Sequence, residues 1–86
     1  MKLVFTETGW EDYQWFQEKD RKHLRRINAL IKEMLRTPFE GTGKPERLVG
    51  DLAGRLSRRI NEEHRIVYAV ENDQVIVFNC RHHYSR

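Results

Sequence analysis

The apolar positions of this chain change their spacing about halfway along it, from the period of a helix to the alternation of a strand. A short strand-like run, Lys2 to Thr6, comes first, and Thr6 or Thr8 is well placed to cap a helix directly after it. Aromatic residues then recur every three positions, as on one face of a helix: Trp10, Tyr13 and Phe16. We therefore predict a strand that is followed at once by a first helix.

A second helix follows the first with almost no connection. Asp20 is its expected N-cap, and its apolar residues form an amphipathic stripe: Leu24, Ile27, Ile31, Met34 and Leu35. Thr37-Pro38 ends this helix, because the residue before a proline disfavours helical backbone angles. A loop rich in glycine and proline then runs from Phe39 to Pro45. Two helices joined so tightly are expected to form a helical hairpin.

The second half of the chain has the character of β-strands. We predict strands over residues 56–61, 65–70 and 74–80, with Asn72-Asp73 as the turn of a hairpin between the last two. The expected order is β-α-α-β-β-β in a single domain over residues 1–86. This order predicts the α+β class, with two N-terminal helices packed on one face of a mainly antiparallel sheet.

Alternation along the predicted strands makes one sheet face more polar than the other. A sheet that is covered by helices on one face leaves its other face open. Because successive side chains point to opposite faces, Arg65 shares a face with Val67, and Arg59 shares one with Ser57. Arg59 and Arg65 are therefore expected on the open face, as a surface suited to binding phosphate.

Composition narrows the class of protein. Eighty-six residues and 10.4 kDa fit one small domain without a separate cofactor domain. With 38% hydrophobic and 34% charged residues, the chain is neither a membrane protein nor disordered. The longest apolar stretch, Val75–Phe78, is too short to span a bilayer, and the N-terminal residues carry no signal-peptide core. The single cysteine, Cys80, excludes an internal disulfide, so we expect a cytoplasmic protein without a membrane partner.

Charge indicates a partner class only weakly. Sixteen Lys and Arg residues against thirteen Asp and Glu residues give a net charge of +3. Many arginines lie in the second half of the chain: Arg47, Arg55, Arg58, Arg59, Arg65, Arg81 and Arg86. Such clustering is typical of proteins that bind a polyanion such as RNA. A solvated surface of salt bridges is the simpler interpretation of charge alone.

Several residues are suited to acid–base chemistry, and each has a purely structural alternative. Glu46 follows a rigid Gly/Pro loop and is either a general base, an exposed loop glutamate or the start of a strand. His83 is either a proton donor or a surface histidine near the chain end. Glu62 and Glu63 lie between arginines, with which they would form surface pairs of little energetic value. Adjacent His82 and His83 point to opposite faces of a regular strand, so we expect no metal site.

Taken together, these residue types fit metal-free cleavage of RNA. A carboxylate removes the proton of a 2'-hydroxyl, and a histidine protonates the 5'-oxygen that leaves. A guanidinium stabilises the charge on the pentacoordinate phosphate between them. An aromatic ring holds a base by stacking. Composition and spacing permit this chemistry without establishing it.

A family resemblance makes this interpretation specific. It is carried by motifs that follow one another along the chain: Met1-Lys2-Leu3 with Trp10-Glu11-Asp12-Tyr13, Arg36-Thr37-Pro38-Phe39-Glu40-Gly41, Gly43-Lys44-Pro45-Glu46, Ser57-Arg58-Arg59-Ile60 with Glu62-Glu63-His64-Arg65-Ile66-Val67-Tyr68, and Cys80-Arg81-His82-His83-Tyr84. In this order and spacing they resemble the YoeB branch of the RelE/ParE superfamily, the toxins of bacterial toxin–antitoxin pairs. The resemblance covers essentially the whole chain. It implies the microbial-ribonuclease-like fold of RelE.

The resemblance also implies roles for individual residues. Glu46 would be the general base, Arg65 the stabiliser of the transition state, and His83 the general acid. Tyr84 would position the substrate by contact with a base. The supporting and RNA-binding positions of the family fall on Lys44, Arg59 and Glu63.

The implied activity is that of an endoribonuclease that enters the ribosomal A site and cuts the mRNA codon there. The family implies no metal and no cofactor. It implies the 70S ribosome and mRNA as partners, an antitoxin of the YefM type, and a toxin homodimer. Two alternatives stay open: a non-cleaving RNA- or ribosome-binding inhibitor of translation, and inhibition of DNA gyrase, which would not need Glu46, Arg65 and His83.

Overall fold

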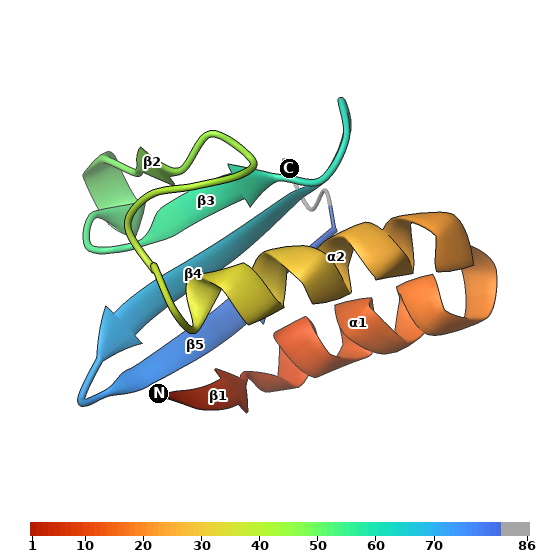
Figure 1. Cartoon of the computed structure of the whole chain (residues 1–86), viewed down its shortest axis with the longest axis horizontal. Coiled ribbons are helices and arrows are strands. Elements are labelled where there is room, and N and C mark those ends of the chain that lie inside the picture. The colour runs from red at the N-terminus through yellow and green to blue at the C-terminus, as the bar shows by residue number, and fades with distance from the viewer. Residues whose placement is uncertain (82–86) are drawn as a thin grey trace.

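A computed structural model describes residues 1–81, and its helices and strands follow the predicted order with one short strand added (Figure 1). In chain order the elements are β1 (Lys2–Phe5), α1 (Glu7–Lys19), α2 (Arg21–Met34), β2 (Glu46–Arg47), the 3-10 helix η1 (Gly50–Leu52), β3 (Leu56–Arg59), β4 (Arg65–Glu71) and β5 (Gln74–Asn79). None of the helices in this part of the chain is long and apolar enough to cross a membrane.

Caps explain where the two helices begin. The Thr6 hydroxyl accepts a hydrogen bond from the Gly9 N–H at 3.0 Å, so Thr6, and not Thr8, caps α1. The Asp20 carboxylate accepts one from the His23 N–H at 3.2 Å and caps α2, as predicted. Asp20 is also the C-cap of α1, so a single residue joins the two helices into the predicted hairpin.

The strands form one mixed sheet in the order β1-β5-β4-β3-β2. Only β1 and β5 are parallel among these neighbours, so the sheet is mainly antiparallel, as predicted. Asn72 and Asp73 have φ values of 52° and 60°, which suit a tight turn between β4 and β5, and the predicted hairpin is confirmed.

Strand β3 ends earlier than predicted, and the short strand β2 confirms the alternative that a strand starts at Glu46. Strand β3 stops at Arg59 instead of residue 61, because the Asn61 side chain accepts hydrogen bonds from the Glu63 and His64 N–H groups and closes a turn. Strand β2 consists of Glu46 and Arg47 alone. Two residues are too few to show the alternation by which a strand is predicted.

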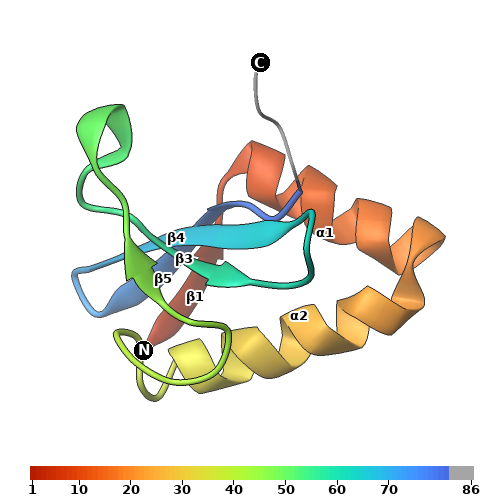
Figure 2. The same cartoon turned by 90° about the horizontal axis from the view of Figure 1, so that it is seen from above.

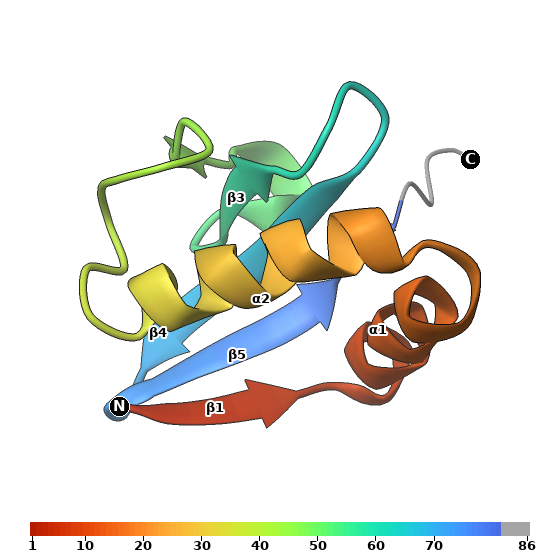
Figure 3. The same cartoon turned by 45° about the vertical axis from the view of Figure 1, so that its right-hand side comes forward.

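Both helices pack on the same side of the sheet, with α2 lying across it (Figures 2 and 3). The buried core joins Phe16 of α1 and Met34 of α2 to Ile66, Tyr68 and Val77 of the sheet. The predicted α+β architecture is therefore confirmed. The other face carries Arg59 and Arg65 at the β2 side, and Leu52 of η1 lies beside the apolar side chains of Val67 and Phe78.

Candidate active site

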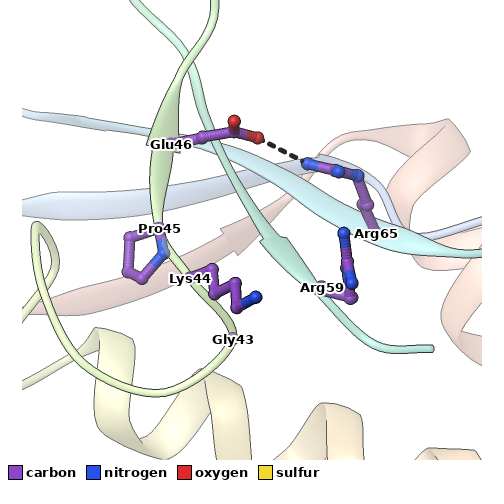
Figure 4. Close-up of a pocket in the computed structure, with 6 residues that line it drawn as sticks. All are labelled: Gly43, Lys44, Pro45, Glu46, Arg59 and Arg65. Atoms are coloured by element: carbon purple, nitrogen blue, oxygen red, sulfur yellow. Dashed lines mark hydrogen bonds and ion pairs between the residues drawn. The ribbon is translucent and has the colours of Figure 1, made fainter. Parts of the chain in front are cut away.

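A small pocket of about 140 Å³ lies where β2, β3 and β4 adjoin on the open face of the sheet. Its walls combine a Gly/Pro loop with charged side chains: Gly43, Lys44, Pro45, Glu46, Arg59 and Arg65 (Figure 4). Four of these six, the charged ones, are site residues that the sequence predicts. The structure thus brings together residues from three separate stretches of the chain.

Strand register explains why these residues meet. Glu46 on β2 is opposite Ser57 on β3, and Arg59 on β3 is opposite Arg65 on β4. Ser57 and Arg59 are two positions apart, so both side chains emerge on the same face of the sheet. A shift of one residue in either pairing would send one partner to the helix-covered face.

Arg65 is held by two neighbours in the pocket. Its Nη1 donates to the Glu46 carboxylate at 2.8 Å and to the Ser57 hydroxyl at 3.1 Å (Figure 4). The Glu46 side chain is 62% exposed and that of Arg65 is 33% exposed. An ion pair so open to water contributes little to stability. Both groups therefore remain accessible to a ligand, and the pair acts mainly to orient them.

The pocket carries an excess of positive charge. Three cationic side chains face one carboxylate, and two of the cations, Arg59 and Arg65, are direct cross-strand partners. Like charges opposite one another destabilise a sheet unless an anion screens them. Within residues 1–81, the charged ends of Lys44 and Arg59 have no hydrogen-bond or ion-pair partner. The arrangement is suited to binding a phosphate group, which guanidinium donors recognise well.

The loop before Glu46 reaches the pocket along a constrained path. Lys44 has a φ of 51°, an uncommon value for a residue with a side chain, and lies between Gly43 and Pro45. The Gly43 carbonyl accepts a hydrogen bond of 2.7 Å from the Arg59 N–H. This bond fixes the loop to the end of β3 at two residues that themselves line the pocket.

Other predicted residues lie elsewhere or outside the described residues. Glu63 is in the turn between β3 and β4, where its carboxylate is 3.5 Å from His64 Nε2 and two-thirds exposed, and it does not line the pocket. Its supporting role stays a prediction. His83 and Tyr84 lie outside the residues that the structure describes.

The chain just before these C-terminal residues is anchored to α1. Buried Asp12 accepts hydrogen bonds from the N–H groups of Cys80 and Arg81, at 2.9 and 3.2 Å. The Arg81 guanidinium stacks 4.0 Å from the centre of the Trp15 ring. Cys80 itself is fully buried, and burial, with the Asp12 charge second, raises the pKa of its thiol to about 12.

Two residues that shape the site were not singled out from the sequence. Ser57 bonds Arg65, and strand alternation with Arg59 was the signal for it. Arg58 was counted among the arginines of a polyanion-binding or salt-bridged surface, but it is fully buried and pairs with Glu33 at 2.6 Å. Among residues 1–81, no three His, Cys, Asp or Glu side chains gather to hold a metal ion.

Comparison with known proteins agrees with the sequence motifs. The family model described as a YoeB-like toxin of bacterial type II toxin-antitoxin systems matches residues 5–84. The toxin YoeB of Synechocystis is 54% identical over 86 residues, the full length of both chains.

Solved structures give the same result. The YoeB/ParE toxin from Agrobacterium tumefaciens has a TM-score of 0.94 and 50% identity, and the match covers 98% of this chain and all of that chain. A chain of the Staphylococcus aureus YoeB-YefM heterotetramer gives 0.90 and 42% over 98% of both chains. The YoeB dimer of the same species gives 0.89. The chain therefore belongs to the YoeB-like toxins of bacterial type II toxin–antitoxin systems.

Proposed function

We propose that this toxin is a ribosome-dependent endoribonuclease that cuts mRNA in the A-site codon without a metal ion. The observation that carries this proposal is the pocket in which the Glu46 carboxylate lies 2.8 Å from the Arg65 guanidinium amid excess positive charge. A base beside a phosphate-binding guanidinium is what attack by a neighbouring 2'-hydroxyl requires. Membership of the YoeB-like toxins supports the same chemistry.

In this mechanism Glu46 takes the proton of the 2'-hydroxyl, whose oxygen then forms a bond to phosphorus. Arg65 binds the phosphate oxygens and stabilises the extra charge that develops on them. The bond between phosphorus and the 5'-oxygen breaks, and His83 gives its proton to that oxygen. The products are a 2',3'-cyclic phosphate upstream and a 5'-hydroxyl downstream.

The remaining site residues bind the substrate. Arg59 and Lys44, whose charges have no partner in the described part of the chain, contact phosphates on either side of the cut. Tyr84 stacks on a base and aligns it. Glu63 supports the arginines from the turn between β3 and β4.

The partners follow from the same function. The toxin acts on mRNA in the 70S ribosome, and therefore in the cytoplasm. The Staphylococcus aureus relative forms a complex with YefM and has been solved as a dimer. We infer that this chain likewise pairs with a YefM-type antitoxin and forms a homodimer.

Primer extension on mRNA bound to programmed ribosomes tests the proposal, with naked mRNA as the control. We expect a cut inside the A-site codon only on ribosomes, and none when the A-site nucleotide lacks its 2'-hydroxyl. Glu46→Ala and His83→Ala are each expected to lower the cleavage rate by about 10²- to 10⁴-fold.

The same experiment distinguishes the nuclease from a non-cleaving inhibitor of translation. If translation stops while the mRNA stays intact, and Glu46→Ala still inhibits, the protein is a non-cleaving ribosome- or RNA-binding inhibitor. A cut in the 2'-deoxy substrate would instead contradict the 2'-hydroxyl mechanism.

A further inference from the structure

We propose that Arg58, together with Glu33, is a positioning residue that holds the loop of residues 37–43 and thereby sets Glu46 opposite Arg65. The effect on cleavage rests on the proposed function, whereas the effect on the loop does not. Arg58 lies between Ser57 and Arg59 on β3, but its side chain points to the helix-covered side of the sheet, away from the pocket.

The buried Arg58 guanidinium directs its donors at this loop or at residues that hold it. The acceptors are the Glu33 carboxylate at 2.6 Å, the Thr37 carbonyl at 2.6 Å, the Glu40 carbonyl at 2.9 Å, the Thr42 carbonyl at 3.3 Å and the Tyr68 hydroxyl at 3.0 Å. Three of these five are backbone carbonyls within residues 37–43. A rigid planar fork is suited to gathering several acceptors at once, which a lysine cannot do.

Glu33 and Tyr68 hold the same loop from either side. The Glu33 carboxylate accepts hydrogen bonds from the Thr42 N–H at 2.7 Å and from the Thr42 hydroxyl at 3.1 Å. The Tyr68 hydroxyl donates to the Pro38 carbonyl at 2.7 Å. The beginning and the end of the loop are thus both fixed to the Arg58 network.

The loop lies so close to this network that glycine is needed. A side chain at Gly41, where φ is 127°, would place its first carbon 2.5 Å from the Glu33 carboxylate. One at Gly43, where φ is 89°, would lie 3.1 Å from Arg58 Cβ. Gly43 then bonds the Arg59 N–H, and Lys44 and Pro45 lead directly to Glu46. The position of Glu46 therefore depends on a contact made on the opposite side of β3.

This placement indicates positioning more than stability. The Arg58 side chain is fully buried, whereas that of Glu33 is 36% exposed. Replacing a whole pair of this kind with apolar residues is often neutral for stability, whereas removing one partner alone is destabilising, so the variants need a stability control. Here the hydrogen bonds converge on one loop that has little apolar content of its own. Because misplacing a catalytic group by about 1 Å can cost about 10²-fold in rate, a loosened loop is expected to slow cleavage.

Three variants separate positioning from folding. Glu33→Ala removes the acceptor for Arg58 and Thr42, whereas Glu33→Gln keeps an oxygen there and serves as the matched control. Arg58→Gln removes the fork itself. Val75→Ala, in buried β5 two strands away from β3, controls for a general loss of stability.

The first readout is hydrogen exchange of the Thr42 and Arg59 amides in the isolated protein, which does not depend on cleavage. We expect faster exchange in Glu33→Ala and Arg58→Gln, a smaller increase in Glu33→Gln, which keeps an acceptor oxygen but loses the charge, and exchange like that of the parent in Val75→Ala. Unchanged exchange at both amides in Glu33→Ala would overturn the inference, whether or not the protein cuts mRNA.

The second readout is single-codon cleavage on programmed ribosomes. We expect kcat to fall by about 10²-fold in Glu33→Ala, with KM for ribosomes changed less than about twofold. In a Glu46→Ala background, Glu33→Ala should have no further effect, because it acts through Glu46. A fall of equal size in both backgrounds would overturn the positioning role. If the parent does not cut at all, the proposed function fails, and the exchange measurement alone decides the inference.

Discussion

At the scale of single residues, the two arginines of the pocket, Arg59 and Arg65, differ in the contacts that their guanidinium groups make. Arg65 Nη1 contacts both Glu46 and Ser57, so its guanidinium is oriented before a substrate arrives. Arg59 has no such partner among the described residues, so we expect it to supply charge alone. Orientation needs a planar group with several donors, whereas charge is equally well supplied by an ammonium group.

Replacing each arginine with lysine therefore gives different expected results. Arg65→Lys keeps the charge but loses the oriented fork, and we expect cleavage kcat on programmed ribosomes to fall by about 10²-fold, as for loss of one transition-state donor. Arg59→Lys, the matched control, is expected to stay within a few-fold of the parent. Equal losses in the two variants would contradict this division of roles.

The same residues show what could be predicted from sequence. Strand alternation placed Arg59 and Arg65 on one open face, and the Gly/Pro loop, followed by the family motif, singled out Glu46. The structure brings all three together. The role of Arg58 could not be predicted. Its acceptors come from α2, from the loop and from β4, and only the complete fold shows that they converge on a buried position.

At the scale of elements, α1 is fixed to β5 by a very close approach. A first side-chain carbon at Gly9 would lie 2.4 Å from the Val77 carbonyl oxygen. The Thr6 hydroxyl also lies within hydrogen-bonding distance of the carbonyls of Val77 and Phe78, at 3.3 and 3.0 Å. The start of the helix therefore has no room to accept a methyl group without moving away from the sheet.

Gly9→Ala is expected to destabilise the fold despite the better helix propensity of alanine. Alanine gains about 1 kcal/mol over glycine within a helix. Overpacking against a backbone oxygen costs about 1–3 kcal/mol, and we expect the cost to exceed the gain. Denaturant midpoints of the variant and of Gln17→Ala, an exposed site on the same helix, measure this. A Gly9→Ala protein more stable than its parent would mean that α1 shifts freely on β5.

The link between α2 and the loop is expected to weaken in acid. The Thr42 N–H, with smaller contributions from the Thr42 hydroxyl and Arg58, lowers the pKa of Glu33 below its ordinary value. A lowered pKa in the folded state gives stability that is present above the unfolded pKa and lost as pH falls through the folded one. The ionised form of Glu33 is thus the one that holds the loop.

Glu33→Gln tests this dependence, because glutamine does not titrate. We expect the parent to be more stable than the variant near pH 7, and the difference to shrink as the pH falls to about 3, below the ordinary pKa of a glutamate. Urea midpoints of both proteins across this range measure the difference. A difference that stays constant with pH would show that the Glu33 charge does not stabilise the fold.

Elements differ in how well sequence predicts them. Both helices were predicted, because a cap and an apolar stripe lie within each segment, as Asp20 and the residues after it show. A strand start at Glu46 was only one alternative among three, and the parallel pairing of β1 with β5 was not predicted. The pairing of β1 with β5 joins segments some seventy residues apart, such as Leu3 and Val75, and no local sequence pattern encodes it.

At the scale of the whole molecule, net charge and local charge make different predictions about RNA binding. The chain carries only +3 overall, but three of its cations surround one pocket at the β2 side of the sheet. Lys2 begins β1, at the opposite edge of the same sheet. If binding depends on the pocket, the two edges must contribute unequally.

The salt dependence of RNA affinity distinguishes binding through the pocket from binding through overall charge. Each phosphate contact to single-stranded nucleic acid adds a slope of about 0.7 to the fall of log K with log salt. For a 2'-O-methyl oligonucleotide, which cannot be cut, we expect Arg59→Gln to reduce the slope by about 0.7, while Lys2→Gln leaves it unchanged. Both variants lower the net charge by one, so equal changes in slope would mean that overall charge, and not the pocket formed by β2, β3 and β4, attracts the RNA.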